Sequence, residues 1–355
     1  MAGAYLHAIG TAVPDHDIHQ AFVRWAGERL GDERTARLFQ RMAARSGIGH
    51  RWSVLPRTGA GGSPVSAGGF YQDAVLPGTA ARMALYAEAA PTLGLEAIDA
   101  LAGRVAIDGI THLVVASCTG FVAPGIDQII ARRLGLAPSV ERLLIGFMGC
   151  YAAVSALRQA RHIVRSEPDA RVLVLCVELS TLHLQAEDAV EPLLAMLQFG
   201  DGAAAALVTG EAGGFALERP FATTLPDSDA LIRWAITDRG FAMHLSGEVP
   251  GRISAGLADA EFALAATGGE APETIDGWAV HAGGRSILDA VEHGFGLGQG
   301  ALADSRAVLA DNGNMSSATL MFVLERLLHR RVGKGVALAF GPGLAAEGLG
   351  FRSAA

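Results

Sequence analysis

Cys150 is the residue in this sequence best placed to do covalent chemistry. It lies in the segment IGFMGCYAAV, where an apolar run ends at Gly149 and a helical pattern begins directly after the cysteine. The N-terminus of a helix carries partial positive charge, which favours the thiolate form of a thiol there. A thiolate in that position is a good acyl acceptor. The alternative is that Cys150 is a small apolar side chain of the core with no chemical role.

His281 and Asn314 are the two other candidates for chemistry. His281 ends the apolar segment WAV and is followed by two glycines and a helical pattern. Such a histidine is available for general acid or base catalysis near neutral pH, or it is one buried core residue among the 11 histidines of the chain. Asn314, in the segment GNMSSA, precedes a serine-rich helix start. Its amide either donates a hydrogen bond to an oxyanion or caps the helix.

Strands and helices alternate along the chain, and Cys150 and His281 both stand where a strand gives way to a helix. This alternation predicts an α/β fold with mostly buried sheets and two similar halves. Apolar runs predict strands at residues 5–13, 111–117, 141–147, 171–177, 203–209, 274–280 and 335–341. Helical periodicity predicts helices at residues 17–30, 33–45, 79–101, 126–136, 151–164, 286–295 and 315–330. The Gly-, Ser- and Pro-rich residues 57–69 predict a surface loop.

Composition excludes several classes of function. The chain has 355 residues, 50% hydrophobic content and a formal net charge of -8, which argues against a nucleic-acid partner. Its cysteines, Cys118, Cys150 and Cys176, are too few and too scattered for a disulfide framework or a metal site, and they favour a cytoplasmic setting. The N-terminus has no signal-peptide pattern and no apolar stretch is long enough to span a bilayer, so no stable membrane insertion is expected.

The ordered set of motifs carries a family resemblance. The segments GFMGCYAA, WAVHAGG, GNMSSA and AFGPG resemble those of the chalcone-synthase-like (type III) polyketide synthases, and CTGFVAPG and QFGDGAAAALV also match. The resemblance covers nearly the whole chain. It implies a thiolase-like αβαβα five-layer sandwich, with the nucleophilic cysteine in residues 1–210 and the histidine and asparagine in residues 211–355. It also implies a homodimer.

The resemblance implies a role for each of the three candidates. Cys150 matches the family's nucleophile, which takes an acyl group from an acyl-CoA starter. His281 would stabilise the Cys150 thiolate as an ion pair, and with Asn314 it would donate hydrogen bonds to the enolate left when malonyl-CoA loses carbon dioxide. The enolate then extends the chain by two carbons, and the product is a pyrone, a resorcinol or a phloroglucinol-type compound. No cofactor and no metal are expected.

Further site residues are implied by the same match. Phe199 matches an aromatic gatekeeper between the CoA tunnel and the cavity, and Met243 stands where the family has a second phenylalanine. Arg41 and Arg45 match positions that bind the CoA phosphates. The other matched substrate-binding residues are Cys118, Thr119, Ser180, His183, Ser316, Phe340 and Gly341.

Other positions depart from the family or have no matched role. Arg285 stands where the family usually has proline, and Ala123 replaces a larger residue. Together with the slim Met243, Ala123 favours a fatty acyl starter that gives an alkylpyrone or alkylresorcinol. Glu178 and Glu191 are interpreted as structural or surface charges.

Three other functions use similar residues. A β-ketoacyl carrier-protein synthase III-like condensing enzyme shares the Cys, His and Asn set, but that group usually shows His-Gln-Ala-Asn and GNTS, whereas this chain has HAGG and GNMSSA. A papain-like hydrolase has the same residue order, with its cysteine near the N-terminus in a different context. An inactive scaffold of the same fold would have no need for a reactive Cys150.

Overall fold

The computed structural model describes residues 3–59 and 61–354, and these residues form a nine-stranded sheet in the order β11–β12–β13–β8–β1–β7–β6–β4–β5. The strands are β1 (Tyr5–Ala12), β4 (His112–Ser117), β5 (Glu141–Gly146), β6 (Val172–Leu179), β7 (Asp201–Thr209), β8 (Phe215–Thr224), β11 (Gly277–Val280), β12 (Gly335–Gly341) and β13 (Ala345–Ser353). Two short hairpins are separate: β2 (His16–Asp17) with β3 (Trp52–Ser53), and β9 (Ile232–Thr237) with β10 (Gly240–Leu245).

The sheet consists of two parts joined at a narrow seam. β1 pairs with β7 along its length, but it pairs with β8 only through Tyr5 opposite Ala216 and Leu6 opposite Phe215. The seam therefore divides the strand order into β5–β4–β6–β7–β1 and β8–β13–β12–β11.

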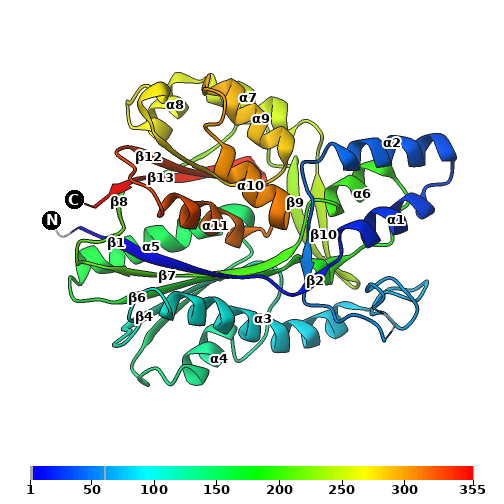
Figure 1. Ribbon diagram of the computed structural model, residues 1–355, viewed down its shortest axis with the longest axis horizontal. Helices are drawn as coiled ribbons and strands as arrows, with labels where there is room; N and C mark the ends of the chain where they lie inside the picture. The colour runs from blue at the N-terminus through cyan, green and yellow to red at the C-terminus, as the bar shows by residue number, and fades with distance from the viewer. Residues whose placement is uncertain (1–2, 60, 355) are drawn as a thin grey trace.

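Helices cover both parts and lie between them, which makes five layers (Figure 1). α3 (Thr79–Ala102) and α4 (Ile126–Arg133) lie outside the first part, and α5 (Ala152–Ser166) and α11 (Ser317–Leu327) lie in the central layer. α7 (Val249–Leu257), α8 (Ala260–Thr267), α9 (Arg285–Gly294) and α10 (Ala303–Asn312) lie outside the second part. The expected αβαβα sandwich is confirmed.

The apolar sequence of the central strands follows from this layering. Every residue of β4, β6 and β7 is buried, because helices cover both faces of the sheet there. The central helices α5 and α11 are also largely buried, and α5 is rich in alanine where it packs between the two parts. A small side chain lets a helix approach a sheet on both sides.

Three more helices form a lobe beside the sandwich. α1 (His19–Arg29), α2 (Glu33–Ala44) and α6 (Val190–Met196) pack around their own apolar cluster, which includes Phe22, Phe39 and Leu197 (Figure 1). This lobe and the β9–β10 hairpin lie at one end of the sandwich.

Most predicted elements are present with small shifts at their ends. α4 ends at Arg133, earlier than the predicted residue 136, and α11 begins at Ser317 rather than at residue 315. The described part of the predicted 57–69 loop contains no helix or strand, and residue 60 lies outside the described residues. Local patterns did not predict β2, β3, β8–β10, β13, α6–α8 or α10.

Candidate active site

The turn that carries Cys150 is held by close packing against a second loop. Residues Gly149–Tyr151 form a single 3-10 turn, and α5 begins directly after it. Gly149 has φ +74, and a Cβ there would lie 2.5 Å from Cδ of Pro342. A Cβ on Gly341 would lie 2.6 Å from the ring of Tyr151. Only glycine permits this approach at both positions, which explains why the GPG loop and the GCY turn occur together.

Asn314 and Ser316 both lie against the thiol of Cys150. Their side chains hydrogen-bond to it and thereby lower its pKa. The Asn314 amide is oriented by two other bonds: Nδ2 donates to the Gly283 carbonyl oxygen at 3.2 Å, and Oδ1 accepts from the Ser316 N–H at 2.8 Å. Ser316 has φ 47, a conformation that costs free energy for a residue with a Cβ and is often found at functional sites.

Phe199 is tied to Asn314 through the backbone. The Asn314 N–H donates to the Gln198 carbonyl oxygen at 2.8 Å, and the Gly200 N–H donates to the Asn314 carbonyl oxygen at 3.0 Å. These two bonds flank an isolated parallel bridge between Phe199 and Asn314. The expected gatekeeper therefore lies beside an expected catalytic residue.

His281 lies at the end of β11, where its N–H donates to the Leu338 carbonyl oxygen at 2.8 Å. Its side chain is buried, and neither ring nitrogen has a hydrogen-bond partner among the described residues. Asn314 bonds to Gly283, which follows His281 closely and packs beside its ring. The imidazole is thus free to bond to a ligand.

Burial opposes charge on both His281 and Cys150. It lowers the pKa of His281 to about 3. It raises the pKa of Cys150 to about 12, in spite of the bonds from Ser316 and Asn314. Burial therefore disfavours either charge by itself, and the thiolate–imidazolium pair implied by the family resemblance stays a prediction. A proton that moves from the thiol to the imidazole leaves the net charge at zero, so close contact between the two groups would remove most of this penalty.

Glu178 is a buried carboxyl group in the same region, not a surface charge. It accepts hydrogen bonds from the Cys118 N–H at 2.9 Å, the Thr119 hydroxyl at 3.0 Å and the Ser317 hydroxyl. Burial raises its pKa to about 7, and its charge raises the pKa of Cys150. The sequence offered one signal for this cluster, since Glu178 lies near the end of β6 and Cys118 comes directly after β4, and these neighbouring parallel strands end at one edge of the sheet.

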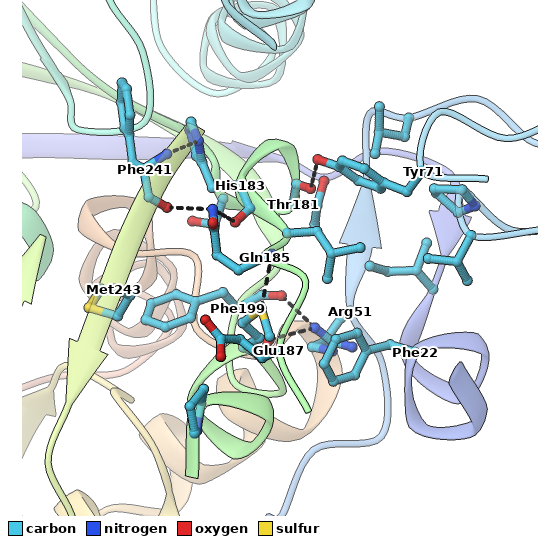
Figure 2. Close-up of a pocket in the computed structure, with 18 of the residues that line it drawn as sticks. Phe22, Arg51, Tyr71, Thr181, His183, Gln185, Glu187, Phe199, Phe241 and Met243 are labelled. Atoms are coloured by element: carbon cyan, nitrogen blue, oxygen red, sulfur yellow. Dashed lines mark hydrogen bonds between the residues drawn. The ribbon is translucent and has the colours of Figure 1, made fainter. Parts of the chain in front are cut away.

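His183 has a structural role in this geometry. Its Nε2–H donates to the Thr119 carbonyl oxygen at 2.7 Å, and its Nδ1 accepts from the Phe241 N–H at 3.0 Å. The ring stacks on Phe241 with centroids 4.2 Å apart, and burial lowers the His183 pKa to about 4. The indole N–H of Trp234 bonds to the Cys118 carbonyl oxygen nearby. His183 thus joins β10 to the loop after β4 as a neutral ring (Figure 2).

A small cavity, called cavity A, lies between α1, α6, β10 and the 57–69 loop. Its volume is about 90 Å³. Phe199, Met243, Ser180 and His183 line it, as expected (Figure 2). Its remaining walls are mostly apolar and include Phe22, Leu55, Val65, Tyr71, Trp234 and Phe241. The charged side chain of Arg51 also lies in the wall of cavity A. Its Nη1 donates to the Phe199 carbonyl oxygen at 2.8 Å, which holds the guanidinium group in place.

A wider cavity, called cavity B, lies on the other side of the 198–199 segment. Its volume is about 810 Å³. It is lined from its mouth inward by Met42, Arg45 and Arg285, and then by Gln198, Gly284 and Gly283. Because Gly283 bonds to Asn314, cavity B ends beside the expected catalytic residues.

The matched residues divide between these surroundings. Arg45 lines cavity B, but Arg41 does not; it lines a separate hollow with Arg34 and Arg37. Cys118, Thr119, Ser316, Phe340 and Gly341 line neither cavity A nor cavity B. Cys118 and Thr119 are instead engaged with Gly149 and Glu178.

The described residues contain neither a candidate metal site nor a candidate membrane span. Within residues 3–59 and 61–354, no group of three or more His, Cys, Asp or Glu side chains is arranged to hold a metal ion. No helix in that part of the chain combines the length and apolar character needed to cross a bilayer.

The site combines a partly buried thiol at a strand–helix turn, an oriented amide against it, and a free imidazole close to the glycine that orients this amide. In a five-layer sandwich this set defines a thiolase-fold acyltransferase. The family comparison is more specific. Residues 2–212 match the model of the N-terminal domain of chalcone and stilbene synthases, and residues 217–355 match that of the C-terminal domain. The chain therefore belongs to the chalcone and stilbene synthase family, the type III polyketide synthases.

Similar proteins come from several kingdoms. The chain is 36% identical over 286 residues to the "Alpha-pyrone synthesis polyketide synthase-like Pks18" of Mycobacterium tuberculosis, covering 76% of this chain and 72% of that protein. It is 37% identical over 304 residues to the bisdemethoxycurcumin synthase of Oryza sativa subsp. japonica, covering 79% and 75%. The crystal structure of PKS-I from the brown alga Ectocarpus siliculosus matches with a TM-score of 0.89 and 29% identity, over 99% of both chains.

These findings establish the class of reaction. The protein is an acyltransferase that catalyses decarboxylative condensation and uses acyl-CoA and malonyl-CoA. The identity of the starter and of the product is a separate question.

Proposed function

We propose that this enzyme transfers a fatty acyl group from an acyl-CoA to Cys150 and extends it with malonyl-CoA to an alkylpyrone or alkylresorcinol. The observation that carries this proposal is cavity A, which is small, mostly apolar and lined by both Phe199 and Met243. A slot of this shape suits a flexible aliphatic chain, because each methylene that leaves water for an apolar wall contributes about 0.8 kcal/mol.

The proposed first step is thioester exchange. The sulfur of Cys150 attacks the carbonyl carbon of the acyl-CoA, the carbon–sulfur bond to CoA breaks, and CoA leaves as the thiol. His281 accepts the Cys150 proton and returns it to the CoA sulfur. The vacant ring nitrogens of His281 support this role, because a buried polar atom without a partner is costly unless a ligand completes it.

The proposed second step is condensation. Malonyl-CoA loses carbon dioxide, and the electron pair of the broken bond forms an enolate. The Asn314 amide and the His281 ring donate hydrogen bonds to the enolate oxygen. The enolate carbon then attacks the carbonyl carbon of the Cys150 thioester, the carbon–sulfur bond to Cys150 breaks, and Cys150 leaves as the thiolate. No cofactor takes part in either step of this proposal.

The relatives add support for the type of product. The printed name of the mycobacterial relative attributes α-pyrone synthesis to that protein. Product analysis by mass spectrometry, with malonyl-CoA and a panel of aromatic, medium-chain and long-chain acyl-CoAs, tests the proposal. We expect pyrones or resorcinols from the aliphatic starters. Activity confined to aromatic starters would reject the fatty acyl assignment.

Met243→Phe should change the preferred length of the starter. Phenylalanine is wider and stiffer than methionine, so at the entrance of cavity A it should exclude long chains. We expect a drop of about tenfold in kcat/KM for long acyl-CoAs, while malonyl-CoA decarboxylation stays within about twofold. The measurement is kcat/KM across the acyl-CoA panel. An unchanged chain-length preference would mean that the tail does not pass Met243.

His281→Ala should change how the reactivity of Cys150 depends on pH. Burial raises the pKa of Cys150 to about 12, and a protonated His281 nearby would lower it. In the variant, the rate of alkylation by iodoacetamide should rise about tenfold per pH unit from pH 7 to 9, since the thiolate fraction does so below the pKa. In the native enzyme the rate should level off at lower pH. Identical profiles would contradict the assigned pair.

We also propose that the enzyme is a cytoplasmic homodimer. β5 is an edge strand with one neighbour, β4, and its Leu143 and Leu144 are exposed, as is the nearby Phe121. An exposed apolar edge strand is a template for pairing with another chain, and a second copy offers the same edge. A mass near 36.7 kDa by light scattering, the mass of one chain, would reject the dimer.

A further inference from the structure

The helix α2, in the lobe beside the sandwich, leaves most of its surface open to solvent. Among its 12 residues only Phe39 and Ala43 are buried, and both face the apolar cluster of the lobe. The lobe projects beyond the end of the sandwich, and α2 lies along its outer side (Figure 1). The opposite side of the helix is therefore a surface on which a partner could dock.

Two large apolar side chains stand on this open side of α2. Leu38 is 42% exposed and Met42 is 44% exposed. They are four residues apart, so they lie next to each other on successive turns of the helix. Both side chains face water in the free protein, and contact with an apolar surface would remove that unfavourable exposure.

Arginines flank this apolar pair. Arg34, Arg37 and Arg41 recur at spacings of three and four residues, which places them on one side of α2, where they line a common hollow. Arg37 is paired with the exposed Glu33, whereas Arg34 and Arg41 form no ion pair within the described part of the chain. The whole chain has a formal net charge of -8, so this cationic surface is opposite in sign to the protein that carries it. It is suited to an anionic partner.

We propose that this surface, called the α2 face and formed by Arg34, Arg37, Leu38, Arg41 and Met42, attaches the enzyme reversibly to an anionic lipid membrane. Arginines beside exposed apolar side chains are typical of helices that lie in the plane of a membrane interface. The guanidinium groups would contact lipid phosphates, and the two apolar side chains would enter the boundary between headgroups and acyl chains. The attachment is peripheral and requires no spanning helix.

A membrane fits the α2 face better than an acidic carrier protein does. This choice rests on the fatty acyl starter proposed above, because a long acyl chain draws its CoA ester from water into a bilayer. The reaction uses CoA esters, so it does not require a docked carrier protein. Met42 also lines cavity B, whose inner end lies beside Asn314, so attachment through α2 would bring that cavity close to the lipid surface.

Co-sedimentation with lipid vesicles tests the attachment in the absence of any substrate. We expect the native enzyme to bind vesicles that mix phosphatidylcholine with phosphatidylglycerol, and to bind pure phosphatidylcholine vesicles at least about tenfold more weakly. Binding to the mixed vesicles should weaken as the salt concentration rises, because salt screens the charge of the arginines.

Arg34→Gln and Leu38→Gln separate the charged and the apolar contributions. Both side chains are exposed and glutamine is a good helix former, so both variants should fold. The partition coefficient on mixed vesicles should fall about fivefold in Arg34→Gln and about threefold in Leu38→Gln. Arg132→Gln on α4 and Leu264→Gln on α8 are the matched controls, because these side chains are exposed on other helices. Neither control should change the binding.

Three results would overturn the proposal. The first is native enzyme that binds neither kind of vesicle or binds both equally. The second is an equal loss of binding in the control variants, which would make the attachment a general effect of charge and hydrophobicity. The third is binding to an acidic acyl carrier protein that Arg34→Gln abolishes, with no binding to vesicles, which would assign the α2 face to a protein partner.

A kinetic comparison connects the attachment to the starter. With enough mixed vesicles to hold most of the palmitoyl-CoA, the variant that combines Arg34→Gln and Leu38→Gln should form product about tenfold more slowly than the native enzyme. With hexanoyl-CoA, which stays in water, the two rates should be equal. Activity confined to aromatic starters would reject the fatty acyl proposal and leave the vesicle result unchanged. Absence of vesicle binding would reject the attachment while long-chain products still form.

Discussion

Cys150→Ala should abolish extended product and covalent acyl loading. The thiol is the attacking group in the proposed first step, and alanine at this buried turn cannot form a thioester. We expect product formation to fall by more than about a thousandfold, as for loss of a covalent nucleophile in other enzymes. The measurement is intact-protein mass spectrometry after incubation with an acyl-CoA, followed by product analysis with malonyl-CoA.

Cys176→Ala is the matched control for this experiment. Cys176 is buried within β6 among apolar residues of the central layer, and burial raises its pKa well above the ordinary range. The variant should load one acyl group and form product at a near-native rate. An acyl adduct that persists in Cys150→Ala would place the nucleophile elsewhere.

Asn314→Ala should separate acyl loading from decarboxylation. The Asn314 amide is oriented by Gly283 and Ser316, so that its donor is fixed before substrate arrives. Removing one such donor to a developing oxyanion costs about a hundredfold to a thousandfold in rate. We expect malonyl-CoA decarboxylation to fall by that amount, while acyl transfer to Cys150 continues.

Asn312→Ala provides the comparison for that variant. Its side chain bonds to Trp52 and Val308 on α10 and does not touch the thiol, so decarboxylation should remain near the native rate. Carbon dioxide release from malonyl-CoA measures both variants. A native rate in Asn314→Ala would remove the amide from the enolate step and leave His281 as the donor.

The two cavities have different walls. Arg45 lines cavity B, and Phe199 lines cavity A. Phe199 and Gln198 are neighbours in the chain, yet each faces a different cavity, because the backbone between them is held against Asn314. The proposed route of a substrate therefore passes the point where gatekeeper and oxyanion donor are joined.

The sequence by itself determined the layered α/β architecture and the positions of Cys150, His281 and Asn314. Local patterns carry this information, since a strand buried on both faces must be apolar throughout, and a helix must show its own period. The close approach of two loops is also visible in the sequence, as glycine at positions 149 and 341. Neither Gly149 nor Gly341 has room for a Cβ. The ordered motifs were enough to indicate the family.

Only the tertiary structure decided the electrostatics of the site and which residues lie around the catalytic candidates. The helix N-terminus favours a thiolate at Cys150, whereas burial acts in the opposite direction and raises the pKa of the thiol to about 12. Glu178 was interpreted as a structural or a surface charge, and it is the structural alternative that holds. The carboxyl is buried among Cys118, Thr119 and Ser317, because strands distant in sequence end at one edge. Burial and desolvation depend on everything packed around a group, so no local pattern reports them.

The walls of the cavities were equally beyond local patterns. Arg41 and Arg45 are one helical turn apart, yet only the orientation of α2 against α9 determines that Arg45, and not Arg41, lines cavity B. His183 proved to be held on both ring nitrogens by Thr119 and Phe241, which come from other strands. Gln198 and Arg285 are far apart in sequence and line one cavity only in the folded chain, because a cavity is a property of the packed chain.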